Sequence, residues 1–74
     1  MTYDLPEWAL TSDDAGRAFV RQIRNSLLVD SDWTQIPDAP ADAVAWATYR
    51  QALRDFPADW VPGPTADFPD PPVS

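Results

Sequence analysis

Apolar side chains recur every four residues along the first half of the chain, at Ala15, Phe19, Ile23 and Leu27. This spacing puts them on one face of an α-helix. Ser12 stands just before the stripe, where its hydroxyl can accept a hydrogen bond from the free amides of a first helical turn. Polar residues weaken the pattern after position 24, so we predict a helix over residues 12–28 whose end falls between 25 and 29.

A second apolar stripe has alternating spacings of three and four residues and is formed by Trp46, Tyr49, Leu53 and Phe56. It predicts a second helix over residues 40–56. Asp38 is the expected N-cap, and Pro40 is expected in the first turn, where its missing amide costs little. Pro57 is expected to stop this helix, because proline lacks the amide that a further turn requires.

The segment between the two stripes, residues 29–40, carries turn-forming residues and two prolines. The run Asp-Ser-Asp at 30–32 favours a turn, because its side chains can bond nearby backbone groups. Pro37 and Pro40 disfavour helical backbone at Ile36 and Ala39, which precede them. The acidic run could also suggest a calcium loop, but the mid-loop glycine and closing glutamate of such loops are missing. We therefore expect a turn with a helix cap here.

This pattern divides the chain into an arm at 1–11, a hairpin at 12–57 and a tail at 58–74. Six of the nine prolines lie at or after position 57 and favour extended or polyproline II backbone. We expect Trp60 and Phe68 to pack on the hairpin or on a partner, with a solvated tail as the alternative. The predicted fold class is all-α: a small antiparallel helical hairpin with an aromatic N-terminal arm and an extended proline-rich C-terminal tail.

Composition narrows the ways in which so short a chain can be stabilised. The 74 residues include neither cysteine nor histidine, which excludes disulfides and zinc sites of the usual kind. No cofactor is expected, and a partner or self-association is the remaining support for a domain of this size. The net charge of −7, with 12 acidic residues against five arginines, should repel nucleic acids and anionic membranes. Mimicry of DNA would need regular rows of carboxylates, which the chain lacks.

The residue types that usually perform catalysis are scarce. No histidine or cysteine can serve as base or nucleophile, and no serine has a histidine or lysine partner anywhere in the chain. Two glycines are too few for a loop that cradles phosphates. A pair of carboxylates could hydrolyse a sugar only in a cleft that so small a chain can hardly build. We therefore predict a binding protein and no enzyme.

Four tryptophans in a chain of this length point to protein binding, because tryptophan buries a large area with few rotatable bonds. For Trp46 we favour a place in the core of the hairpin. Trp33 stands in the connector, where it either plugs the end of the hairpin or docks on a partner. Arg50 and Arg54 share a helical face and either clasp Asp38 or the acidic tail, or pair with a partner.

Two runs resemble those of the phage tail assembly chaperone family: RxxRNxLLxxSDWTQIPDAP at positions 21–40 and WAxYRQALRDFP at positions 46–57. The resemblance covers residues 17–57 and, loosely, the proline-rich end. It implies a non-enzymatic protein that binds a phage tail fibre protein, at its trimeric C-terminal region, and aids its folding, trimerisation or attachment. It also implies action in the host bacterial cytoplasm during assembly, with self-association or multiple copies per fibre.

Many members of that family carry a larger N-terminal part, where this chain has a short aromatic arm. The alternative is therefore a permanent small structural subunit that stays in the tail of the virion. In either role, we expect a set of partner-binding residues and no catalytic or metal-binding ones. This set is Trp33, Thr34, Gln35, Ile36, Pro37, Trp46, Tyr49, Arg50, Arg54 and Trp60.

Overall fold

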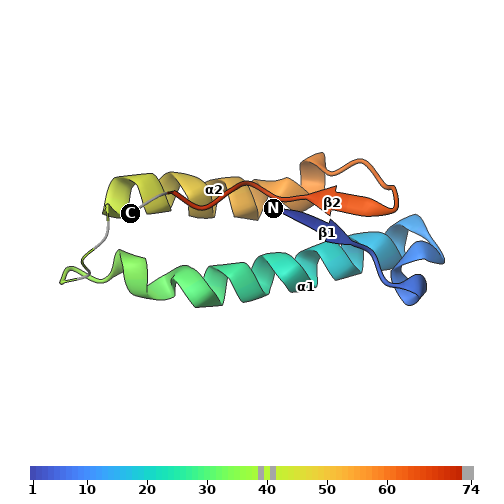
Figure 1. Ribbon diagram of the computed structural model, residues 1–74, viewed down its shortest axis with the longest axis horizontal. Helices are drawn as coiled ribbons and strands as arrows, with labels where there is room; N and C mark the ends of the chain where they lie inside the picture. Colours follow the sequence, from blue (N-terminus) through green and yellow to red (C-terminus); the bar gives the residue numbers. More distant parts are fainter. Residues whose placement is uncertain (39, 41, 73–74) are drawn as a thin grey trace.

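The computed structural model describes residues 1–38, 40 and 42–72. Two antiparallel helices form a rod, and the two terminal segments meet along one side of it (Figure 1). The rod measures 43 × 17 × 16 Å between Cα atoms. Its elements are β1 (Thr2–Asp4), the 3-10 helix η1 (Glu7–Leu10), α1 (Asp13–Ser31), the 3-10 helix η2 (Asp32–Gln35), α2 (Ala43–Asp59) and β2 (Thr65–Asp67).

Helix α1 begins where the sequence predicts and ends later. The Ser12 hydroxyl accepts a hydrogen bond from the Ala15 amide at 3.0 Å, which confirms the N-cap. The helix continues to Ser31, so the prediction of an end between positions 25 and 29 was wrong. Leu27 and Leu28 are partly buried against the core, and the Ser31 hydroxyl donates to the Leu27 carbonyl at 2.8 Å. This burial and this bond offset the weak helix formers before them.

The start of α2 also differs from the prediction. Asp42 is the N-cap instead of Asp38, since its carboxylate accepts from the Val44 and Ala45 amides at 3.1 Å each. Two satisfied amides make Asp42 the stronger cap, and Pro40 consequently lies outside the helix. Ile36 has the extended backbone predicted before Pro37, with φ −81° and ψ 146°. The prediction for Ala39 lies outside the described residues.

Pro57 does not stop α2, contrary to the prediction, and lies inside its last turn, which runs to Asp59. A proline so close to the end removes only one hydrogen bond of the helix. The neighbouring carbonyls are satisfied, because the Trp60 amide donates to Phe56 at 2.8 Å and Arg17 Nε donates to Pro57 at 3.2 Å. Burial of the Pro57 and Trp60 side chains favours this longer helix.

The arm and the tail form a small antiparallel sheet, which the all-α prediction omitted. Strands β1 and β2 pair Thr2 with Asp67, Tyr3 with Ala66 and Asp4 with Thr65. Main-chain bonds extend the pairing on both sides, from Leu5 to Pro64 and from Phe68 to Met1. Each strand has only three residues, and an alternating pattern cannot be recognised over so short a stretch. The molecule is therefore mostly helical, with a two-stranded sheet made by its terminal segments.

The hydrophobic core draws on the arm, both helices and the tail. Its buried members are Leu5, Ala9, Val20, Tyr49, Leu53, Trp60, Ala66 and Phe68. The Phe68 ring lies 4.4 Å from the Phe56 ring and 5.4 Å from that of Tyr3, measured between centroids. Trp60 and Phe68 are only 7% and 2% exposed, so the prediction that they pack on the hairpin is confirmed. After the end of α2 the tail lies as a strap on the hairpin over residues 60–72; Val73 lies outside the described residues.

Candidate partner-binding surfaces

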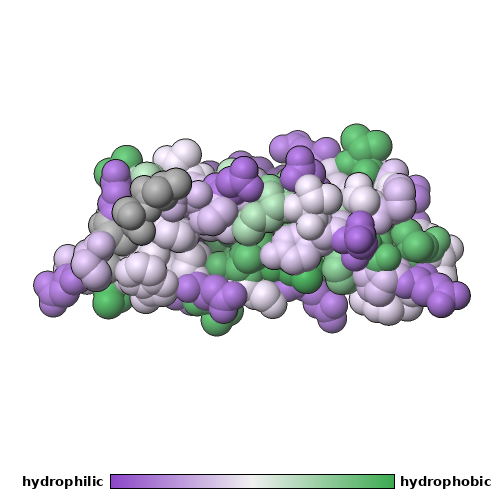
Figure 2. Space-filling model, viewed as in Figure 1, coloured by the Kyte–Doolittle hydropathy of each residue, from purple (hydrophilic) through white to green (hydrophobic). Residues whose placement is uncertain are grey.

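Large apolar side chains reach the surface at both ends of the rod (Figure 2). One group, which we call the connector surface, consists of Val29, Trp33, Ile36 and Val44, with exposed fractions of 68%, 46%, 57% and 77%. The other group is Trp8, Leu10 and Val61 at the opposite end. Apolar residues that are exposed in one region and rimmed by polar ones are candidates for a protein-binding surface.

Trp33 is the one aromatic member of the connector surface. It is carried by η2, and its ring centroid lies 6.2 Å from that of Trp46 at an interplanar angle of 53°. Trp46 packs edge-on against Tyr49 at 5.5 Å and belongs, partly buried, to the hydrophobic core, as interpreted from the sequence. Trp33 therefore rests on the core through one side of its ring and leaves the rest free for a partner.

Arg50 fixes the connector end from within. It is 8% exposed, and its guanidinium donates to the Leu28 carbonyl at 2.6 Å, to the Ser31 hydroxyl at 2.8 Å and to the Asp32 carboxylate at 2.7 Å. Its counterion is thus Asp32 and neither Asp38 nor the tail. A planar, always charged guanidinium suits such a multiple contact. This network joins α2 to the end of α1 and to η2, and so sets the position of Trp33.

Two polar residues brace the same connector. Thr34 is fully buried, and its hydroxyl donates to the Ser31 carbonyl at 2.6 Å. Gln35 Nε2 donates to the Thr34 hydroxyl at 3.1 Å and to the Ala43 carbonyl at 3.4 Å. Ile36 and Pro37 are exposed beyond them. The connector thus combines a braced polar interior with an apolar exterior.

Three other residues of the predicted partner-binding set, Tyr49, Arg54 and Trp60, lie outside the connector. Tyr49 is buried, and burial raises the pKa of its phenol, with smaller contributions from nearby ionisable groups. The Arg54 side chain is exposed, and its carbonyl accepts a long bond from Arg24 at 3.5 Å. Trp60 lies buried at the opposite end of the rod. The structure therefore gathers most of the predicted residues at the connector, and Trp60 is separate from them.

Val29 and Val44 were not predicted, although a signal for them exists. Each is an apolar residue outside the apolar stripe of its own helix, next to the connector. Exposed Asp30, Asp38 and Asp42 belong to this end, while the charge of Arg50 is paired with Asp32. The connector surface is therefore apolar with an acidic rim.

The described part of the chain shows no group of three or more acidic, histidine or cysteine side chains placed to hold a metal ion. Asp32 of the acidic run is engaged by Arg50 instead. Within the same residues, neither helix is both long enough and apolar enough to span a lipid bilayer.

A family model described as phage tail assembly chaperone protein matches residues 17–73. The chain belongs to the phage tail assembly chaperone family. This is a non-enzymatic family whose members bind phage tail proteins, as the resemblance implied. No curated protein and no solved structure matches the chain. The matched span contains most of α1, all of α2, the connector and the strap, so the connector surface lies within the family's shared region and the arm lies outside it.

Proposed function

We propose that this phage tail assembly chaperone binds the tail fibre protein and aids its folding, trimerisation or attachment, and that it docks through the connector surface. The observation that carries this proposal is Trp33, a large ring left 46% exposed on a segment braced by a buried arginine. Aromatic residues of this kind dominate binding energies when a partner covers them.

The bracing of the connector supports a docking role. Ordering a flexible loop on binding costs free energy, and a segment that is already fixed avoids that cost. Arg50 and Thr34 hold the connector from the inside, while Trp33 and Ile36 keep their apolar surface outside. The exposure of Trp33 is more than a core residue usually has, and the hydrogen bonds that hold the connector are more than a solvated loop usually has.

The acidic rim indicates the chemistry of the fibre surface. Three exposed carboxylates around an apolar centre favour a partner with an apolar groove flanked by lysine or arginine, because opposite charges steer association and suppress wrong partners. A trimeric fibre would present three equivalent grooves, so several copies of the chaperone would bind one fibre.

The test is Trp33→Ala, with Gln22→Ala, an exposed change on α1 outside both groups of apolar residues, as control. Each variant is co-expressed with the fibre protein, and affinity is measured by calorimetry on the purified partners. We expect Trp33→Ala to cost at least about 2 kcal/mol of binding, or roughly thirtyfold in affinity, with an unchanged circular dichroism spectrum. Unfolding of the variant, or binding equal to that of the unchanged protein, would show that Trp33 only plugs the hairpin.

Mass spectrometry of purified virions distinguishes a releasable chaperone from a permanent structural subunit. A chaperone that leaves after assembly should be absent from mature particles. Peptides of this chain at a fixed ratio to the fibre protein would instead identify a subunit of the tail.

A further inference from the structure

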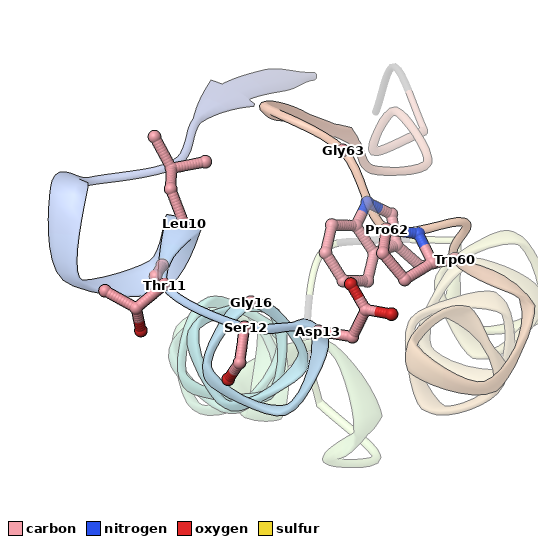
Figure 3. Close-up of a pocket in the computed structure, with 9 residues that line it drawn as sticks. Leu10, Thr11, Ser12, Asp13, Gly16, Trp60, Pro62 and Gly63 are labelled. Atoms are coloured by element: carbon pink, nitrogen blue, oxygen red, sulfur yellow. The ribbon is translucent and has the colours of Figure 1, made fainter.

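A cleft of about 340 Å³ opens at the end of the rod opposite the connector (Figure 3). It lies between the end of η1 and the start of α1 on one side and the turn that follows α2 on the other. The lining residues are Ala9, Leu10, Thr11, Ser12, Asp13, Gly16, Trp60, Pro62 and Gly63. Its volume is at the low end of the roughly 300–1,000 Å³ of ligand sites, which suits one or two side chains of a partner.

The walls of the cleft are already in place and are of mixed polarity: Leu10, Trp60 and Pro62 are apolar, whereas Thr11, Ser12 and Asp13 are polar. Leu10 stands across the opening from Trp60 and Pro62 (Figure 3) and is 52% exposed. The indole of Trp60 is fixed, because its Nε1 donates to the Thr65 carbonyl at 3.1 Å. Gly16 permits this position, since a Cβ there would lie 2.8 Å from the Trp60 ring. A ligand would therefore meet a preformed slot with both apolar and polar contacts, rather than one that it must open.

The charge of the cleft is negative. The Asp13 carboxylate extends from the start of α1 towards Trp60 and Pro62 (Figure 3), and Glu7 and Asp14 are exposed close to it in sequence. The one cation that contacts the lining residues in the described part of the chain is Arg17, whose guanidinium is engaged by the Pro57 and Trp60 carbonyls and forms no ion pair with Asp13. None of the ion pairs formed by the described residues involves Asp13. An anionic ligand would be repelled, and a cationic one would be attracted.

We infer that this cleft is a second docking site, for an extended protein segment that places an aliphatic side chain between Leu10 and Trp60 and an adjacent lysine or arginine against Asp13. The slot supplies the apolar contact, and the carboxylate supplies the charge complementarity. Val61, 81% exposed beside the cleft, extends the apolar surface for the backbone of the segment. This inference goes beyond the connector surface, which does not include any of these residues.

Two sites at opposite ends of a 43 Å rod would let one chaperone hold two places on its partner. Linked contacts of this kind raise the overall affinity above that of either site, because the second contact forms within the complex. A weak cleft would therefore still contribute to binding.

The test uses the full chain and a defined probe, the tetrapeptide acetyl-Gly-Leu-Arg-Gly-amide, followed by two-dimensional NMR. We expect shift changes that saturate and that are confined to the amides of Leu10, Asp13 and Gly16 and to the Trp60 indole N–H. Replacing arginine by glutamate in the probe, or leucine by glycine, should remove them. Equal binding of either altered peptide would overturn the proposed ligand class, and the absence of shifts with the original peptide would overturn the site.

Variants of the protein complete the test. Asp13→Asn should weaken the tetrapeptide about two- to fivefold, as expected for an exposed ion pair, whereas Asp30→Asn, with the same change of net charge at the connector, should not. Leu10→Ala should weaken it, and Val29→Ala should not. Equal effects of both members of either pair would contradict the cleft. The Trp33→Ala measurement is independent, so the two sites can fail separately.

Discussion

At the connector end, three hydrogen bonds from Arg50 join α2 to the end of α1 and to η2. At the arm end, the chain closes through a sheet between segments more than 60 residues apart, together with the buried side chains of Trp60 and Phe68. The connector end is thus held by a side-chain polar network, and the arm end by strand pairing and apolar packing between distant segments. The Arg50 network holds the connector in place and leaves its apolar side chains exposed. At the arm end, by contrast, the apolar side chains are themselves part of the hydrophobic core.

The largest effect should come from removing the strap. A chain ending at Ala58 loses Trp60, Ala66 and Phe68 from the core and leaves β1 without its partner. Each large apolar side chain contributes about 1.5–3 kcal/mol when buried, and a domain of this size has little stability in reserve. We expect the truncated protein to be unfolded at room temperature. Circular dichroism and the dispersion of NMR signals check this, and a truncated chain that keeps its melting temperature would show that the hairpin stands alone.

A smaller effect is expected at the connector, from Arg50→Met. The methionine fills a similar volume but leaves the Leu28 carbonyl, the Ser31 hydroxyl and the Asp32 carboxylate without their donor. We expect a loss of about 2 kcal/mol in the free energy of unfolding, as for hydrogen bonds to a charged group. Folding should survive, because the apolar core is unchanged. Denaturant titration measures the loss.

The double variant Arg50→Met/Asp32→Asn is the control for this prediction. If the two side chains act through their ion pair, the combined loss should be smaller than the sum of the two single losses. Strict additivity would mean that Arg50 acts through its bonds to α1 alone.

Several features of the two ends could be predicted from the sequence, and others could not. The helices, the Ser12 cap and the extended backbone at Ile36 follow from local pattern and local chemistry, and all are observed. The packing of Trp60 and Phe68 was also predictable, since apolar side chains in a proline-rich tail must find apolar surface. In each case the cause lies in neighbouring residues or in composition.

The cap of α2, the counterion of Arg50 and the strand pairing could not be predicted, because each depends on which of several residues the folded chain brings together. Both Asp38 and Asp42 can cap a helix, and only the packing of the hairpin selects Asp42. Arg50 had several acidic candidates, and the end of α1, three residues longer than predicted, brought Asp32 to it. The sheet joins two short strands that carry no recognisable pattern. Val29 and Val44 at the connector surface were not predicted, because single apolar residues outside a helical stripe do not show from the sequence whether they are exposed.

Gly16→Ala tests the close packing of the arm end, with an expected loss of about 1 kcal/mol. The new Cβ would lie 2.8 Å from the Trp60 ring and 3.2 Å from the Ala9 carbonyl, and such overpacking costs about 1–3 kcal/mol. The better helix propensity of alanine offsets at most about 1 kcal/mol of this. Gly63→Ala is the matched control, because its nearest neighbour would be 3.9 Å away. Thermal unfolding should show a loss for the first variant only.

The smallest effect concerns Tyr49, which lies in the core between the two ends. Burial raises the pKa of its phenol above the ordinary value of 10.0, and the nearby charges of Asp30 and Asp70 add to this. The folded protein therefore keeps this proton to a higher pH than the unfolded chain does. The resulting stability is fully present below pH 10.0 and is lost as the pH rises through the folded-state pKa. Denaturant titrations across this alkaline range should show a decline for the unchanged protein that is weaker in Tyr49→Phe. The same decline in both proteins would assign it to another group, because phenylalanine has no proton to lose.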